Sequence, residues 1–224
     1  MGNLRIYEEL ILLALCEEKG TMGTSFLQYA VSGALLSELM FMKRLQIEEN
    51  KKKLVNIVDA SPTGDALLDE CLEKIASAKR RANMKAWVQR LASIKDLRHK
   101  VAHSLVQHRI VEASEDKILW LFTRKVYPEV NPIPEKEIRN RMRNAVLSAE
   151  AKVDPRTTVL IALAKSAALL PQVFSKEELK QYKKRIEQIV AGDLMGDVTK
   201  EVIAACQAAV MVAVMIPAIT VATT

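Results

Sequence analysis

Two basic residues three positions apart, Lys95 and Arg98, are the side chains of this sequence best suited to bind an anionic group. Both fall in a segment, residues 95–108, whose apolar residues recur at helical spacing. Side chains three positions apart share one face of a helix, so the ammonium and guanidinium groups can converge on one phosphate. The alternative is an ordinary solvated helix face, with Asp96 nearby. The spacing therefore makes this pair a candidate headgroup site.

The two histidines His99 and His103 stand four positions apart on the same predicted helix, which is a spacing found between metal ligands. The residues between them supply no carboxylate or thiolate, and the neighbouring Arg98 and Lys100 would repel a cation. We therefore interpret both histidines as partly exposed surface residues, and we expect no metal and no other cofactor.

The sequence carries no recognisable catalytic motif. It has no Gly-x-Ser-x-Gly elbow, no glycine-rich phosphate loop, and no Cys–His pair with an evident orienting partner. The pair Asp69-Glu70 follows a predicted helix start, where carboxylates are ordinarily solvated or capping charges, although acid–base catalysis is the alternative. The sequence therefore predicts a protein that binds a partner and is not an enzyme.

The overall charge and the cysteines indicate the environment of the protein. A formal net charge of +6, with a pI near 9.2, suggests anionic partners such as phospholipid surfaces or nucleic acid. The cysteines Cys16, Cys71 and Cys206 are odd in number and widely spaced, which fits a reducing compartment better than a disulfide framework. The N-terminal residues lack the basic-then-apolar layout of a signal peptide. Together these features predict a cytoplasmic protein.

The elements that must position these residues are mainly helices. Half of the residues are apolar and only 4% are aromatic, so the composition favours helices around a sizeable core. Apolar periodicity predicts helices at residues 4–18, 25–43, 84–94, 95–108, 135–151, 155–170 and 175–190, and one more that contains Leu67, Leu68, Leu72 and Ile75. Hairpins are predicted at 44–58, with a basic tip at 51–53, and at 109–124, turning at Ser114-Glu115-Asp116. We expect one mainly α domain spanning residues 1–224, with a central helical bundle ringed by amphipathic helices, plus two short β-hairpins.

The return strand of the second hairpin, residues 117–124, contains Ile118, Leu119, Trp120, Leu121 and Phe122 and is more apolar than a strand with one solvated face. We single out Ile118, Leu119 and Trp120. One interpretation is a core or subunit-interface strand. The other is that part of it enters a bilayer interface, where tryptophan is favoured. These three residues are therefore candidates for membrane or oligomer contact.

Residues 202–224 contain no charged side chain and are long enough to span a bilayer. The segment is rich in alanine, contains Gln207 and Pro217, and has no basic or aromatic flank at its far end. These features favour a buried helix that closes the core over a transmembrane anchor.

Helices followed by a hairpin with a basic tip also describe a winged-helix DNA reader. The helix before the hairpin would then have to present polar residues to the major groove, and residues 25–41 are far too apolar for that. We therefore expect no nucleic-acid partner.

In their order along the chain, these motifs resemble the Golgi phosphoprotein family. The most specific part is Pro62-Thr63-Gly64-Asp65 followed by Leu67-Leu68-Asp69-Glu70. Further matches in the same order are Tyr7 to Leu15, Thr24-Ser25-Phe26, Glu38-Leu39, Arg44-Leu45-Gln46, Trp87, Leu97-Arg98 to Leu105-Val106, and Asp154-Pro155-Arg156. The similarity extends from Leu4 to about Val214.

The resemblance implies a peripheral membrane adaptor. Eukaryotic members of the family read phosphatidylinositol 4-phosphate on Golgi membranes and retain glycosyltransferases by their cytosolic tails. The resemblance therefore implies an anionic phospholipid surface and such tails as partners, at the cytosolic face of a membrane. The short form of the chain resembles bacterial members, for which another anionic lipid is the natural ligand.

The family's phosphate pocket uses two basic residues three apart, and Lys95 and Arg98 match them here. It also uses a Trp and an Arg near the second helix, where this chain has Leu27 and Ser32 or a neighbour. The family hairpin, implicated in self-association and membrane contact, corresponds to roughly residues 114–125. We therefore expect headgroup binding by Lys95 and Arg98, aided by the hairpin, in a homo-oligomer. The alternative is a soluble protein-interaction or oligomerisation module with no lipid specificity.

Overall fold

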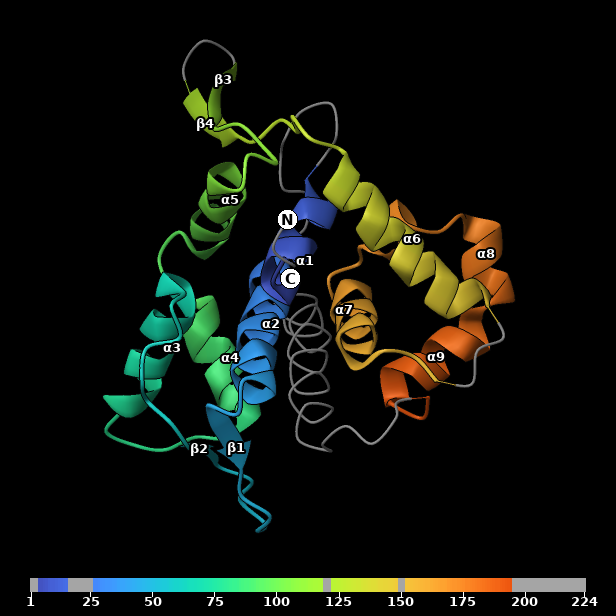
Figure 1. Cartoon of the computed structure of the whole chain (residues 1–224). Coiled ribbons are helices and arrows are strands. Elements are labelled where there is room, and N and C mark those ends of the chain that lie inside the picture. The colour runs from blue at the N-terminus through green and yellow to red at the C-terminus, as the bar shows by residue number, and fades with distance from the viewer. Residues whose placement is uncertain (1–3, 16–25, 119–121, 149–151, 195–224) are drawn as a thin grey trace, which may run out of the picture.

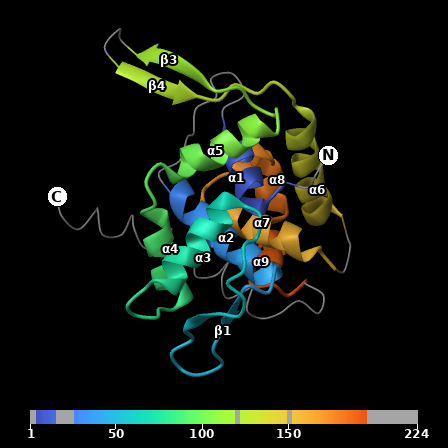
Figure 2. The ribbon, with the colours of Figure 1, turned by 60° about the vertical axis from the view of Figure 1, so that its left-hand side comes forward.

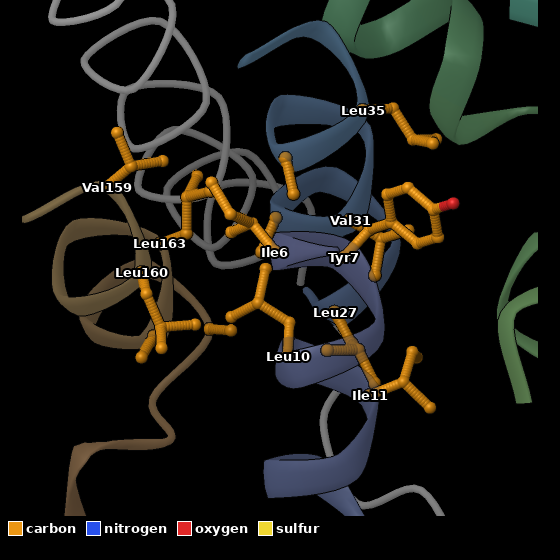
Figure 3. Packing of buried hydrophobic residues seen from close by; sticks show 14 of the residues in the cluster. Ile6, Tyr7, Leu10, Ile11, Leu27, Val31, Leu35, Val159, Leu160 and Leu163 are labelled. Atoms are coloured by element: carbon orange, nitrogen blue, oxygen red, sulfur yellow. The ribbon is translucent and has the colours of Figure 1, made fainter. Parts of the chain in front are cut away.

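Three apolar helices form the centre of the computed structural model, which describes residues 4–15, 26–118, 122–148 and 152–194 (Figure 1). They are α1 (Ile6–Ala14), α2 (Leu27–Phe41) and α7 (Pro155–Ser166). Every residue of α1 is buried, as are most residues of α2 and α7. A helix that is apolar on all sides is stable only where other helices surround it. Figure 3 shows Ile6 and Leu10 of α1 packed between α2 and the α7 residue Leu160.

Amphipathic helices surround this centre on two sides (Figure 1). One side carries α3 (Ala66–Ala76), α4 (Met84–Ala92) and α5 (Leu97–Gln107), and the other carries α6 (Ile133–Leu147), α8 (Lys176–Gln181) and α9 (Lys183–Ala191), with the short 3-10 helix η1 (Leu170–Gln172) before α8. The predicted fold class, mainly helical with two short hairpins, is confirmed. The extent of the domain over all of residues 1–224 stays a prediction.

Two predicted helix boundaries were wrong. The segment 175–190 forms two consecutive helices, α8 and α9, which meet at Tyr182. The segment 155–170 stops at Ser166, because Ala168 adopts a left-handed backbone conformation (φ 57°) before η1. A left-handed residue cannot continue a right-handed helix.

The first hairpin, β1 (Leu45–Ile47) and β2 (Val55–Ile57), lies where the sequence predicted it, with Leu45 opposite Ile57. Its turn is held by the side chain of Asn50, whose amide oxygen accepts hydrogen bonds from the backbone N–H groups of Lys52 and Lys53. Asparagine is favoured at such positions because its side chain can replace a backbone acceptor.

The second hairpin differs from its predicted register. Its strands are β3 (Ser114–Ile118) and β4 (Phe122–Val126), so the residues predicted to form the turn lie within β3. Residues 109–112 belong to the helical body instead, because Ile110 and Val111 are buried in the core. Pairing of Val111 with Glu129 keeps this part of the chain on the body, and the hairpin begins only beyond it.

Within the described ranges, no helix combines the length and the apolar character needed to cross a bilayer. The uncharged segment 202–224 lies outside those ranges, so the choice between a core helix and a membrane anchor stays a prediction.

A fully buried carboxylate joins the three central helices. Glu38 of α2 accepts a hydrogen bond from the backbone N–H of Ile6 (2.7 Å) and two from the guanidinium of Arg156 in α7 (2.6 and 3.0 Å). Arg5, just before α1, lies 3.8 Å from the same carboxylate. A buried charge costs several kcal/mol unless it is paired and hydrogen-bonded. Burial of α2 with its Glu38 carboxylate therefore depends on Arg156 and on the first N–H of α1, which compensate the charge.

We expect Glu38→Ala to lower the free energy of unfolding by about 3 kcal/mol, because it leaves the half-buried Arg156 without its partner. Urea denaturation followed by circular dichroism would measure the change. The control is Glu73→Ala on the exposed face of α3, which should change stability by less than about 0.5 kcal/mol. Equal effects of the two substitutions would contradict a structural role for the Glu38 carboxylate.

Candidate anion-binding site

Lys95 and Arg98 do not lie on one helix face. The helix α5 begins at Leu97, and the residue before it, Asp96, has a left-handed backbone conformation (φ 57°). The chain therefore turns sharply between Lys95, which precedes the helix, and Arg98, which lies in its first turn. The prediction of a shared helix face was wrong, because helical spacing applies only where both residues are helical.

The two cations line different cavities. Arg98 lines a small cavity of about 270 Å³, together with Gln28 of α2 and residues that lead from α4 into α5. Its guanidinium forms no hydrogen bond or ion pair with any residue in the described ranges. The opposing charge in the wall is Asp96. The small cavity thus offers one guanidinium with free donors, beside a neutral amide and an imidazole.

Lys95 lines a larger cavity of about 1230 Å³. Its walls come from α1, the start of α3, one side of α5 and the base of β4. All three histidines of the chain, His99, His103 and His108, line this cavity. In both views of the ribbon, α5 lies beneath the β3–β4 hairpin (Figures 1 and 2).

Hydrogen bonds between residues that line the larger cavity hold its walls in position. The hydroxyl of Tyr7 donates to Asp65, and the same carboxylate caps α3 by accepting from the N–H groups of Leu67 (3.0 Å) and Leu68 (3.1 Å). Burial and the bond to Asp65 raise the pKa of Tyr7 above its usual value. Asp65 is thus the N-cap of α3, a position at which a carboxylate is favoured.

A second set of contacts ties α1 to α5. The carboxylate of Glu8 accepts from the hydroxyl of Ser104 and from the backbone N–H of Arg5 (2.8 Å), and it lies 3.4 Å from Nε2 of His108. Nearer the start of α5, Lys100 is paired with Glu70 of α3 at 2.5 Å. The acidic groups Glu8, Asp65 and Glu70 are therefore all engaged by neighbouring donors.

His99 lines both cavities, as does Asp96. Its Nδ1 lies 3.0 Å from the hydroxyl of Tyr127, next to the hairpin. Burial lowers the pKa of His99, and the positive charges of Lys125 and Arg98 lower it further, while Asp96 opposes them. Burial and cations from two different segments thus disfavour protonation of this imidazole.

The structure describes only the first of the three residues predicted to contact a membrane or another subunit. Ile118 is paired with Phe122 in the hairpin, whereas Leu119 and Trp120 fall outside the described residues. Their role in membrane or oligomer contact stays a prediction. Across the part of the chain that the structure describes, no three His, Cys, Asp or Glu side chains are grouped so as to hold a metal ion.

Sequence reasoning missed Gln28, Lys125 and Tyr127 as members of these cavities. The histidines were noticed only for their metal-like spacing. Lys125 and Tyr127 follow α5 at a distance in sequence and come near His99 only because the base of the hairpin returns to the body. No local pattern could have indicated this.

We expect Lys125→Met to raise the pKa of His99 towards its usual value, because the substitution removes one of the positive charges that oppose protonation. Titration of the imidazole resonances by NMR would measure it. The control Lys176→Met changes a distant exposed charge and should leave the His99 titration unaltered. A lowered or unchanged pKa in Lys125→Met would contradict the electrostatic coupling.

The comparisons with known proteins identify the family. The family model for Golgi phosphoprotein 3 (GPP34) matches residues 6–206. The chain is also similar to vacuolar protein sorting-associated protein 74 of Eremothecium gossypii, with 25% identity over an alignment of 219 residues. That match covers 82% of this chain and 64% of the relative, so the chain spans just under two thirds of the relative's length. Because the family model covers most of the chain, this protein belongs to the Golgi phosphoprotein 3 (GPP34) family.

Proposed function

We propose that the protein is a peripheral membrane adaptor that binds an anionic phospholipid headgroup. The observation that carries the proposal is the guanidinium of Arg98 in the small cavity at the start of α5, which has no hydrogen-bond or ion-pair partner among the residues that the structure describes. A guanidinium can bind a phosphate through two parallel hydrogen bonds, which are stronger than bonds between neutral groups. Membership of the Golgi phosphoprotein 3 family and the net charge of +6 support a cationic surface facing a membrane.

Because Lys95 and Arg98 line different cavities, we give the two side chains different roles in this proposal. Arg98, with Gln28 and His99 beside it, becomes the main headgroup contact in the small cavity. Lys95 is exposed at the same end of α5 and adds attraction for an anionic surface without sharing that cavity. Asp96 opposes an anion in the small cavity and therefore limits its affinity.

The family supports further parts of the proposal. Following the eukaryotic relatives, phosphatidylinositol 4-phosphate is the first lipid to test, and another anionic lipid is the alternative. An adaptor role implies cytosolic tails of membrane proteins as clients, at the cytosolic face of a membrane. The protein would act by binding and not by catalysis.

We expect Arg98→Ala to weaken binding to vesicles that contain the ligand lipid by about fivefold or more, since a basic residue near anionic lipid contributes about 1 kcal/mol. Asp96→Asn should instead strengthen binding, because it removes the opposing charge while asparagine tolerates the left-handed conformation. Flotation would measure both, using phosphatidylcholine vesicles with phosphatidylinositol 4-phosphate or with phosphatidylglycerol.

The control for flotation is Lys176→Ala, which removes an exposed charge from α8 on the other side of the central helices. It should bind as the wild type does. Equal binding by wild type and Arg98→Ala on both vesicle types would exclude the small cavity as the headgroup site.

A second candidate function is self-association through the β3–β4 hairpin. The hairpin projects from the helical body (Figure 2), and its two strands form a separate two-stranded sheet. Both strands are edge strands, which present unpaired backbone groups to which another chain can bind. The corresponding function is an oligomerisation or protein-interaction module.

Replacing residues 114–125 by a short glycine–serine linker should lower the mass in solution if the hairpin joins subunits. Light scattering would measure the mass, and the His99–Tyr127 contact lies outside the deletion. Circular dichroism would verify that the helices remain. An unchanged mass of a folded deletion variant would argue against self-association through the hairpin.

A further inference from the structure

The turn of the first hairpin is strongly cationic. Lys51, Lys52 and Lys53 are all exposed there, and their side chains form no hydrogen bond or ion pair with the residues that the structure describes. The side chain of Asn50 holds the turn by accepting from the backbone N–H groups of Lys52 (2.9 Å) and Lys53 (3.2 Å). Three exposed ammonium groups are therefore carried by a turn whose backbone is fixed.

The loop between α3 and α4, residues 77–83, brings further cations to this hairpin. Pairing of Leu54 with Asn83 joins the loop to the second strand of the hairpin. Earlier in the loop, Lys79 and Arg80 are exposed, and their side chains also have no partner among the described residues. The backbone carbonyl of Arg80 accepts a hydrogen bond from Arg90 of α4 (3.2 Å), which keeps the loop against that helix.

Few acidic groups accompany these cations. Residues 48–58 and 77–83 together contain six lysines and arginines but only two carboxylates, Glu48 and Glu49. Glu48 is already engaged, because it accepts hydrogen bonds from Asn50 (2.7 Å), Asn56 (3.0 Å) and Arg81. Positive charge is therefore in clear excess on this surface, which can attract a polyanion.

The cationic surface is far from the proposed headgroup site. Helix α2 begins beside the small cavity, which Gln28 lines, and leads at its other end into β1. Its 15 residues span about 22 Å. Figures 1 and 2 show the β1–β2 and β3–β4 hairpins at opposite ends of the molecule. A membrane that contacts Arg98 and the β3–β4 hairpin would leave the cationic surface facing away from it.

The side chains of this surface suit carboxylates better than nucleic acid. Residues 48–58 and 77–83 include no aromatic residue, and Trp87 of the adjoining α4 is buried, so no platform for base stacking is present in these segments. Four of the five cations without a partner are lysines, whereas phosphate recognition favours the forked guanidinium of arginine. Lysines act as point charges on flexible stems and can follow a row of carboxylates without a fixed geometry.

We propose that the surface formed by Lys51, Lys52, Lys53, Lys79 and Arg80 is a docking site for an extended acidic segment of another protein. Successive carboxylates of that segment contact the ammonium groups of the turn and the cations of the loop. The interaction is electrostatic, so it forms rapidly and weakens as salt is added. It requires neither Arg98 nor a membrane, and the protein could therefore bind a lipid surface and an acidic partner at the same time.

The test uses a fluorescent peptide of about ten glutamates, titrated with the full chain and followed by fluorescence anisotropy at low and at physiological ionic strength. The triple substitution Lys51→Gln, Lys52→Gln and Lys53→Gln should weaken binding by about eightfold, since each exposed ion pair contributes a factor of about two. The double substitution Lys79→Gln and Arg80→Gln should weaken it by about fourfold for the same reason. Circular dichroism would verify that both variants keep the helical fold.

The matched control replaces three exposed lysines of α8 and α9 by glutamine, at Lys176, Lys180 and Lys184. It changes the net charge by the same amount and should bind the peptide within about twofold of the wild type. Arg98→Ala should also bind the peptide as the wild type does. Loss of flotation in Arg98→Ala with retention of peptide binding would show that the two sites are separate.

Four results would overturn the proposal. Two of them are no binding of the peptide at low ionic strength and equal weakening by the two triple substitutions. The third is tighter binding of a single-stranded RNA of about the same length and charge, dependent on the same three lysines, which would assign the surface to nucleic acid. The fourth is loss of vesicle flotation in the hairpin variant with no change in peptide binding, which would assign the surface to the membrane.

Discussion

The carboxylate of Glu38 is fully buried in the last turn of the apolar helix α2, and the arrangement of the other helices depends on how that charge is compensated. Removing a carboxylate from water costs more than a single hydrogen bond returns. Here the compensation comes from the first helical N–H of α1 and from Arg156 of α7, so three segments far apart in sequence must meet at one point. The apolar contacts of α1, α2 and α7 supply most of the burial, but they are not directional. The hydrogen bonds of Glu38 are directional, and they therefore determine how the three helices are oriented towards one another.

From this centre the position of α1 determines the site. With α1 held by Glu38, Tyr7 reaches Asp65 at the start of α3, and Glu8 reaches Ser104 of α5. These two contacts hold α3 and α5 against α1 and form the walls of the larger cavity. The same contacts engage Asp65 and Glu8, and Lys100 is paired with Glu70, while Lys95 and Lys125 have no hydrogen-bond or ion-pair partner among the described residues.

The left-handed backbone conformation of Asp96 then separates the side chains of Lys95 and Arg98. It directs Lys95 into the larger cavity and Arg98 into the small one, with His99 between them. In the proposed function, Lys95 and Arg98 would therefore meet an anionic surface at two separate points. Two separate contacts would favour a ligand or a membrane surface that presents more than one phosphate, and they make the affinity dependent on the geometry of the start of α5. The hairpin above α5 contributes to the same region through Lys125 and Tyr127 at its base.

The sequence by itself determined most of the helices, the first hairpin and the family, because each depends on residues close together in the chain. Helical periodicity, an Asn turn and an N-cap all act over a few residues, and the Pro62-Thr63-Gly64-Asp65 block combines a left-handed glycine (φ 81°) with the capping carboxylate. Only the tertiary structure decided the register of the second hairpin, the separation of Lys95 from Arg98, and the approach of Lys125 to His99. The first depends on burial of Ile110 and Val111 in the core, and the second on a single backbone angle at Asp96. The third requires a strand to return to a helix from which it is distant in sequence, and long-range contacts of this kind leave no periodic pattern in the chain.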